Sequence, residues 1–363
     1  MEYRHVPSPS GRDKTIKQDG MEWKGSSRRV RAAVLFKMKR SSTIKRISSL
    51  ALAFLMCALC FAGCGKDKKD GGYTIGICQL VQHDALDAAT NGFMQALKDK
   101  LGDKVTFDVQ NASGEPTNCT TICSKLVSDK VDLIMANGTA ALSAAAQATD
   151  TIPIVATSVT DFATALGIKD WSGKTGFNVT GTSDLAPLDK QADMIKELVP
   201  NAKLVGILYC SSEANSKYQS NVMQEKLTAL GLDFKEFTFV DTNDVSAVAQ
   251  QAATECDVIF APTDNVVASN GPAINNILEP TKIPLIAGEQ GICIKCGVAT
   301  LSISYYDIGY KAGEMAYEIL VNGADPAEMD VEYAKDLTKE YMADRCRDFG
   351  ITVPADYSPI NDQ

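Results

Sequence analysis

Histidine is almost absent from this chain, and its scarcity excludes several kinds of catalytic and metal site. Two of the 363 residues are histidines, and beyond residue 64 only His83 remains. The H-E-x-x-H motif of zinc hydrolases and the G-x-S-x-G motif of serine hydrolases do not occur. A nucleophile that needs an imidazole base could be built only around His83. We therefore predict that the chain is not an enzyme.

Phosphate-binding and dinucleotide-binding motifs are also missing. No G-x-G-x-x-G follows the first predicted strand. The stretch "WSGKTG" at 171–176 is similar to the end of a phosphate-binding loop, but Ile168 stands where its first glycine should be. No apolar strand leads into this stretch, so a surface turn is the better interpretation. We expect no cofactor.

Positive charge is scarce outside the first 64 residues. Those residues carry 13 basic and 4 acidic side chains, whereas the rest of the chain carries 23 basic and 41 acidic ones. Nucleic-acid phosphates are bound by Lys and Arg, so an acidic body argues against a nucleic-acid partner.

The one long apolar run, residues 47–62, is too short to predict a transmembrane helix with confidence. It follows Lys45 and Arg46 and precedes Cys64, an order that resembles a bacterial lipoprotein signal cut before a lipidated cysteine. A plain secretory signal or a short anchor is the alternative. We predict a signal peptide at 38–63, a lipidated tether at 64–72 and a location on the outer face of the cell membrane. Residues 1–37 fit no part of a signal, and we interpret them as a mis-annotated extension before Met38.

Eight of the eleven cysteines lie beyond Cys64. Three of them, Cys78, Cys210 and Cys256, lie in or beside apolar strand-like runs and are most simply small buried side chains. The pair Cys293/Cys296 in "CIKC" is compatible with free thiols, a disulfide or half of a zinc site. Zinc would need two further ligands, and the body has one histidine and no second C-x-x-C. We expect no metal.

Hydrophobic periodicity predicts an α/β protein with parallel sheets. Buried strand-like runs such as "YTIGICQL" alternate with amphipathic helices, as in the stripe Leu86, Ala89, Phe93 and Leu97. The pattern restarts at "KLVGILYC" (203–210), which indicates two doubly wound lobes. We predict lobe 1 at 73–181 plus 292–322 and lobe 2 at 182–288 plus 326–363. The expected crossover hinges are near 179–182, 288–291 and 322–325.

Polar clusters follow almost every predicted strand. They occupy residues 79–84, 136–141, 156–161, 211–216, 262–265 and 288–291. Ligands of open α/β sheets bind outside the carboxyl ends of the strands, so two facing lobes would bring all six clusters to one cleft. Helix capping is the alternative explanation for any single cluster.

Several of these stretches together resemble one family. "IGICQLVQHDALDAATNGF", "TSVTDFATALG", "YCSSEANSKYQ", "PTDNVVAS" and "ATLSISYYDIGYKAGEMA" are similar to the tryptophan/tyrosine-type substrate-binding lipoproteins of ABC transporters. The resemblance implies a type I periplasmic-binding-protein-like fold whose two lobes close on a small molecule. It also implies delivery of that molecule, often an aromatic amino acid, to a membrane permease with its ATPase. A lipoprotein that senses the ligand and signals to a membrane kinase is the alternative function.

If the ligand is a free amino acid, residues of these clusters can be assigned to its carboxylate, its ammonium and its side chain. We expect its carboxylate at the helix start near Thr139 and Ala140, assisted by the hydroxyl of Thr157 or Ser158. We expect its ammonium at Asp264 first and Glu289 second. The remaining candidate contacts are Asn215, Ser216 and Asn265, with Gln79 and His83 near the side-chain pocket.

The chain departs from the family pattern at three places near the expected cleft. Family members often have Glu-His-Pro where this chain has Gln82-His83-Asp84, and Asp-Pro where it has Asp161-Phe162. The "CIKC" stretch is also unusual. These departures leave the identity of the ligand open.

Overall fold

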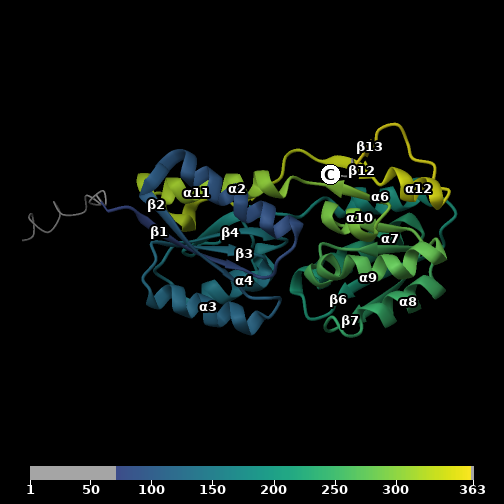
Figure 1. The fold of residues 1–363 in the computed structure, drawn as a ribbon, viewed down its shortest axis with the longest axis horizontal. Helices are drawn as coiled ribbons and strands as arrows, with labels where there is room; N and C mark the ends of the chain where they lie inside the picture. The colour runs from purple at the N-terminus through teal and green to yellow at the C-terminus, as the bar shows by residue number, and fades with distance from the viewer. Residues whose placement is uncertain (1–70, 361–363) are drawn as a thin grey trace, which may run out of the picture. The chain divides into compact units, whose positions relative to one another are not determined.

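The computed structural model describes residues 71–360, which form two α/β lobes (Figure 1). The expected signal segment, Cys64 and most of the expected tether lie outside the described residues. No helix within the described range is long and apolar enough to span a bilayer.

The first lobe is built around a six-stranded sheet in the order β11-β5-β4-β3-β1-β2. Its first segment runs through β1 (Tyr73–Gln79), α2 (Asp84–Leu101), η1 (Gly102–Lys104), β2 (Val105–Asn111), α3 (Pro116–Ser128), β3 (Leu133–Asn137), α4 (Thr139–Ala148), β4 (Ile154–Val159), α5 (Phe162–Leu166) and β5 (Val179–Ser183). Its second segment contains α11 (Tyr305–Tyr317), η2 (Glu318–Asn322), η3 (Pro326–Glu328) and β11 (Glu332–Tyr333).

The second lobe is built around a seven-stranded sheet in the order β13-β12-β10-β9-β8-β6-β7. Its first segment runs through α6 (Leu188–Leu198), β6 (Leu204–Cys210), α7 (Ala214–Leu230), β7 (Asp233–Phe239), α8 (Val245–Glu255), β8 (Val258–Ala261), α9 (Asn265–Thr281), β9 (Leu285–Ala287), α10 (Gln290–Cys296) and β10 (Ala299–Ser302). Its second segment contains β12 (Thr338–Tyr341), α12 (Ala343–Asp348) and β13 (Ser358–Pro359).

Both lobes repeat one topology. The strands β1 to β5 and β6 to β10 each run parallel in the spatial order second, first, third, fourth, fifth, which is that of a doubly wound sheet. Among the named strands of residues 71–360, only β12 departs from the expected parallel pairing, because it runs antiparallel to β10. The predicted α/β fold with two lobes is confirmed.

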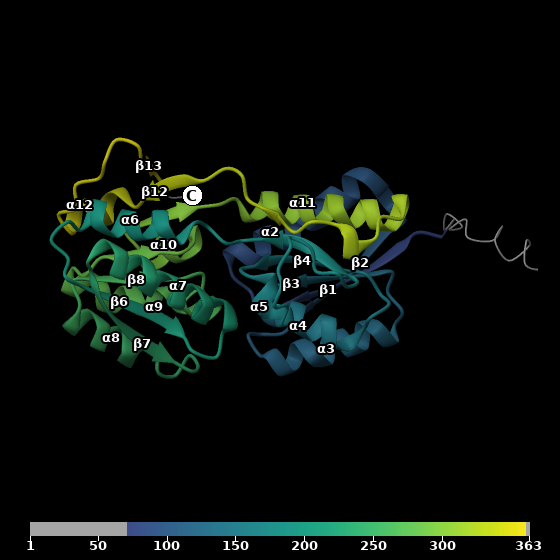
Figure 2. The same cartoon turned by 180° about the vertical axis from the view of Figure 1, so that it is seen from behind.

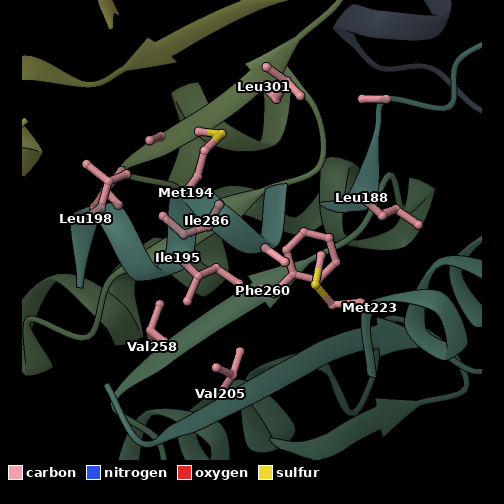
Figure 3. Close-up of a cluster of buried hydrophobic side chains, with 14 of the residues drawn as sticks. Leu188, Met194, Ile195, Leu198, Val205, Met223, Val258, Phe260, Ile286 and Leu301 are labelled. Atoms are coloured by element: carbon pink, nitrogen blue, oxygen red, sulfur yellow. The ribbon is translucent and has the colours of Figure 1, made fainter. Parts of the chain in front are cut away.

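Helices cover both faces of each sheet. In the first lobe α2 and α11 lie side by side over one face, and α3 and α4 cover the other (Figures 1 and 2). In the second lobe α6 and α7 pack on one face, where side chains such as Met194, Ile195 and Phe260 interdigitate (Figure 3). The opposite face is covered by α8, α9 and α10. The predicted stripe of α2, from Leu86 to Leu97, is fully buried.

The lobe boundaries differ from those expected. The chain crosses between the sheets after β5, after β10 and after β11, at residues 184–187, 303–304 and 334–337. Residues 292–302 therefore belong to the second lobe and residues 326–333 to the first. The expected hinge at 288–291 lies within the second lobe and the one at 322–325 within the first, because β10 completes the second sheet before the chain returns.

Gly309 allows α11 to pack closely on α2. A methyl group at this position would lie 2.0 Å from the carbonyl oxygen of Ala89. We expect Gly309→Ala to lower the free energy of unfolding by about 2 kcal/mol in urea denaturation, because the helices must separate. An exposed helical Gly→Ala change would instead raise it by about 1 kcal/mol. Lys311→Ala, on the same helix but half-exposed, is the control and should change stability little. Unchanged or increased stability in Gly309→Ala would contradict this packing.

Candidate functional site

A small chamber lies between the two lobes, at the carboxyl ends of strands from both sheets. Its volume is about 20 Å³, the space of one or two waters. The chamber is lined by His83, Leu86, Ser158, Thr160, Asp184, Asn215, Thr263, Asp264, Asn265, Ala268, Glu289 and Tyr305. Five of the six predicted polar clusters contribute to this lining, and the sixth lies beside it.

His83 and Asn265 join the lobes across the chamber. The Nε2 atom of His83 lies 3.1 Å from Oδ1 of Asn265. The amide nitrogen of Asn265 donates to Glu213 at 2.7 Å, so its oxygen faces His83 and the imidazole donates through Nε2. Burial lowers the pKa of His83 and favours the neutral ring. This contact closes the chamber on one side.

A second contact between the lobes joins two of the departures from the family pattern. The ammonium of Lys295, within "CIKC", lies 3.0 Å from the carboxylate of Asp84. Lys295 also donates to the carbonyl oxygen of Ala268 at 3.1 Å. Because the side chain of Asp84 is largely exposed, the pair contributes about 1 kcal/mol or less.

Asp264 is the N-cap of α9 and is 1% exposed. Its two carboxylate oxygens accept from the backbone N–H groups of Val267 and Cys210, at 2.8 and 2.7 Å. Burial raises its pKa, while these hydrogen bonds oppose the shift. Asp264 therefore both caps α9 and lines the chamber.

Glu213 also accepts hydrogen bonds from the start of α9. It was not among the predicted site residues. Its carboxylate accepts from the backbone N–H groups of Asn265 and Val266 and from the amide of Asn215, at 2.9 to 3.2 Å. Burial raises its pKa, and the nearby negative charge of Asp264 raises it further.

Glu289 caps α10 in the same way. It is 4% exposed and accepts from the backbone N–H groups of Gly291 and Ile292, at 2.6 and 2.5 Å. Burial raises its pKa to about 7 despite these hydrogen bonds.

Asp184 lies on the first crossing between the lobes and was not among the predicted site residues. It accepts from the hydroxyl of Thr160 and from the hydroxyl of Tyr305, which follows the second crossing, both at 3.0 Å. Burial raises its pKa to about 6. The sequence feature that could have identified Asp184 is its position directly after the strand-like "FNVTGTS". A chain that crosses between lobes at this point can place the side chain in the cleft.

Two hydroxyls of the chamber have no hydrogen-bond partner within residues 71–360. Ser158 is 5% exposed and comes from the first lobe, whereas Thr263 is 8% exposed and comes from the second. Ser158 also has a φ of 54°, where the pairing of β4 with β5 becomes irregular. Buried polar atoms are usually paired, and strained backbone concentrates at functional sites. These two hydroxyls leave hydrogen-bonding capacity at the chamber that a polar ligand group could satisfy.

A larger groove adjoins the chamber and has a volume of about 550 Å³. Asn215 and Asn265 line both spaces. Both lobes contribute to the groove, whose lining includes the apolar side chains of Leu80, Val81, Pro116, Val240 and Val266. Thr139 and Ala140, at the start of α4, line this groove and not the chamber. Its size falls within the range of small-molecule sites.

The structure does not bring three expected site residues to either space. Gln79 is held inside the first lobe, where its amide donates to Val81 and Asp87 and accepts from Thr90. Thr157 accepts from Thr182 at 2.9 Å, and Ser216 accepts from Asn215 at 3.2 Å. All three side chains are buried among partners of their own lobe.

The eight cysteines of the described chain are free and buried, so Cys293 and Cys296 form no disulfide. Both face the core under α9 and α10. Burial raises the pKa of Cys296 to about 12, which disfavours the reactive thiolate. Among residues 71–360 no group of three potential ligands is placed to hold a metal ion.

The sequence profile of the family described as "ABC transporter substrate binding protein" matches residues 74–356. This chain belongs to that family. The tyrosine-binding protein of Clostridioides difficile (strain R20291) is 36% identical over 291 residues, which cover 76% of this chain and 84% of that protein. The expected tryptophan/tyrosine-type family is thereby confirmed.

Solved structures agree with this assignment. A protein from Streptococcus pneumoniae in complex with L-Trp has a TM-score of 0.75 at 31% identity, covering 78% of this chain and 96% of that one. The ligand-free, open structure of a substrate binding protein with adhesive properties from Clostridium difficile has a TM-score of 0.62 at 37% identity, covering 80% and 100%.

Family membership settles the functional class of this substrate-binding protein. Substrate-binding proteins of ABC transporters are extracytoplasmic carriers that capture a ligand and are not enzymes. The prediction that the chain is not an enzyme is confirmed on this ground.

Proposed function

We propose that this substrate-binding protein captures an aromatic amino acid between its lobes and delivers it to a membrane permease of an ABC importer. The hydroxyls of Ser158 and Thr263 are the observation that carries the proposal, because one comes from each lobe and both are buried without a partner. The names of the relatives support an aromatic ligand, since one is a tyrosine-binding protein and another was solved with L-Trp.

The ligand's two ends would occupy different spaces. A chamber of about 20 Å³ is too small for a whole amino acid but suits an ammonium group once the lobes adjust slightly. The aromatic ring would extend past Asn265 into the groove of about 550 Å³, against Leu80 and Val266. Asp264, Asn215 and Asn265 would contact the ligand, as would Glu289, in keeping with the expected ammonium partners.

Closure of the lobes would couple binding to transport. The chain superposes better on the L-Trp complex than on the open, ligand-free structure, although it is more identical in sequence to the open one. Lobes of similar internal fold superpose together only when their relative orientation agrees. A ligand that contacts both lobes would favour the closed form, which the permease would recognise. Lipidation at Cys64 would hold the protein at the membrane.

A melting-temperature screen against the twenty amino acids tests this function. A ligand that binds only the folded state stabilises it by about 2.7 kcal/mol at a hundredfold excess over its Kd. We expect tyrosine, tryptophan or phenylalanine to raise the melting temperature and the other amino acids to leave it unchanged. A shift with none of the three would reject the aromatic assignment while leaving the family intact.

Ser158 provides a test in which stability and binding change in opposite directions. Ser158→Gly relieves the backbone strain at a φ of 54° and should raise the free energy of unfolding by about 0.5–1 kcal/mol. The same change removes the hydroxyl and should weaken amino-acid binding about tenfold, since one hydrogen bond to a charged group is lost. Denaturation and calorimetric titration measure the two effects. Unchanged affinity would remove Ser158 from the site.

A further inference from the structure

The chamber is lined by acidic groups and becomes anionic as they ionise, which burial delays by raising the pKa of Glu289 to about 7 and that of Asp184 to about 6. Its described lining includes the carboxylates of Asp184, Asp264 and Glu289 and no lysine or arginine. The nearest cation along α10, Lys295, is held by Asp84 and by the carbonyl oxygen of Ala268. A positive ligand group is favoured in such a space, whereas a carboxylate would be repelled.

Two helix termini of the second lobe that lie at the chamber, those of α9 and α10, are not open to an anion. The N-termini of helices attract carboxylates, and α9 and α10 both begin at the cleft. The carboxylates of Asp264 and Glu213 already occupy the start of α9, and that of Glu289 occupies the start of α10. The carboxylate sites at the starts of α9 and α10 are thus filled by the protein itself, whereas the start of α7, at the groove, has no side-chain cap.

The unpaired hydroxyls fit the same ligand group. Ser158 and Thr263 are more than nine-tenths buried, line the chamber and can each accept hydrogen bonds. An ammonium has three donors and no acceptor, so it can satisfy both hydroxyl oxygens and a carboxylate together.

We propose that this site selects a primary ammonium and gains little from the ligand's carboxylate, so that arylalkyl amines bind nearly as well as the aromatic amino acids. This inference rests on the proposed function and specifies its ligand class. The carboxylate would lie toward the groove near Thr139 and Ala140, where α4 has no side-chain cap. A helix terminus that opens onto a solvent-filled groove typically changes affinity by about twofold to fivefold.

Calorimetric titration of the purified protein at pH 8 with matched ligands tests the proposal. Tyramine and tryptamine lack the carboxylate of tyrosine and tryptophan, and 3-(4-hydroxyphenyl)propionate lacks the ammonium of tyrosine. We expect each amine to bind within tenfold of its amino acid and the propionate to bind at least a hundredfold more weakly than tyrosine. Amines weaker by more than tenfold, or a propionate equal to tyrosine, would overturn the proposal.

The same titrations distinguish the inference of ammonium selection from the proposed amino-acid function. If the amino acids bind and the amines do not, the ammonium-only inference fails and the proposed function stands. If the amines bind and the amino acids do not, the inference stands and the amino-acid function fails. If no ligand of the series binds, both are rejected.

A charge-removing variant gives an independent readout. Glu289→Gln keeps an oxygen for one N–H group of α10 but removes a negative charge from the chamber. We expect it to weaken tyrosine and tyramine by the same factor, about tenfold or more, because both present the same ammonium. Glu328→Gln, on the exposed surface of the first lobe, is the matched control and should bind both like wild type. Weakening of tyrosine alone would overturn the proposal.

Discussion

Replacement of Asp264 by alanine is expected to weaken binding of tyrosine or tryptophan at least a hundredfold. The carboxylate is buried in the chamber, and an ammonium placed there would lose its nearest counter-charge. Losing one partner of a buried charge pair costs about 3–5 kcal/mol, which corresponds to a hundredfold or more in Kd. Calorimetric titration of the variant measures the effect.

The stability of Asp264→Ala must be measured separately, because the same side chain caps α9. Loss of the cap leaves the N–H groups of Val267 and Cys210 without their acceptor, and we expect a loss of about 1–3 kcal/mol. Cooperative urea denaturation would show that the variant is folded when binding is tested. Asp325→Ala removes the cap of η3 at a residue that lines neither the chamber nor the groove, and should retain full affinity. Wild-type affinity in Asp264→Ala would remove Asp264 from the site.

Stability and ligand affinity are expected to depend on pH in opposite directions. The pKa of Glu289 is raised to about 7 and that of Asp184 to about 6, so the folded protein holds protons that the unfolded chain releases near pH 4. The free energy of unfolding without ligand should therefore fall as pH rises from 5 to 8, by about 3 kcal/mol. Glu213 and Asp264 act in the same direction, since burial also raises their pKa values.

His83 opposes this trend because its pKa is lowered by burial, but it is one group against four carboxyls. An ammonium binds the ionised carboxylates, so affinity should rise about tenfold or more between pH 5.5 and pH 8. Denaturation and titration at both pH values test the two slopes. In Glu289→Gln both slopes should become shallower. Equal affinity at the two pH values would contradict an ammonium held by carboxylates.

The sequence predicted the lobes well because buried parallel strands and amphipathic helices leave a clear periodic signal. The stripe from Leu86 to Leu97 and the restart at 203–210 both proved to be what their spacing indicated. Lobe boundaries were harder to predict. β10 has only four residues, and whether such a strand joins one sheet or the other depends on pairing with β9, which no local pattern encodes.

The candidate site was predictable only in part for a similar reason. Polar clusters after strands pointed to the cleft, because the carboxyl ends of parallel strands meet at one edge. Gln79 and Thr157 lie within regular strands and bond inside their own lobe. His83 follows β1, and Ser158 lies in β4 at a φ of 54°, where the strand pairing becomes irregular; both line the chamber. Asp184 and Tyr305 come together only because two crossings of the chain run side by side, which the sequence does not reveal.

A crystal structure of the protein with bound tyrosine or tryptophan would show directly which ligand group the chamber holds. We expect the ligand's nitrogen to lie within hydrogen-bond distance of Asp264 or Glu289 and of the hydroxyls of Ser158 and Thr263. We also expect the aromatic ring to lie in the groove beyond Asn265. A ligand whose carboxylate occupies the chamber, or one bound wholly outside it, would contradict an ammonium site in the chamber.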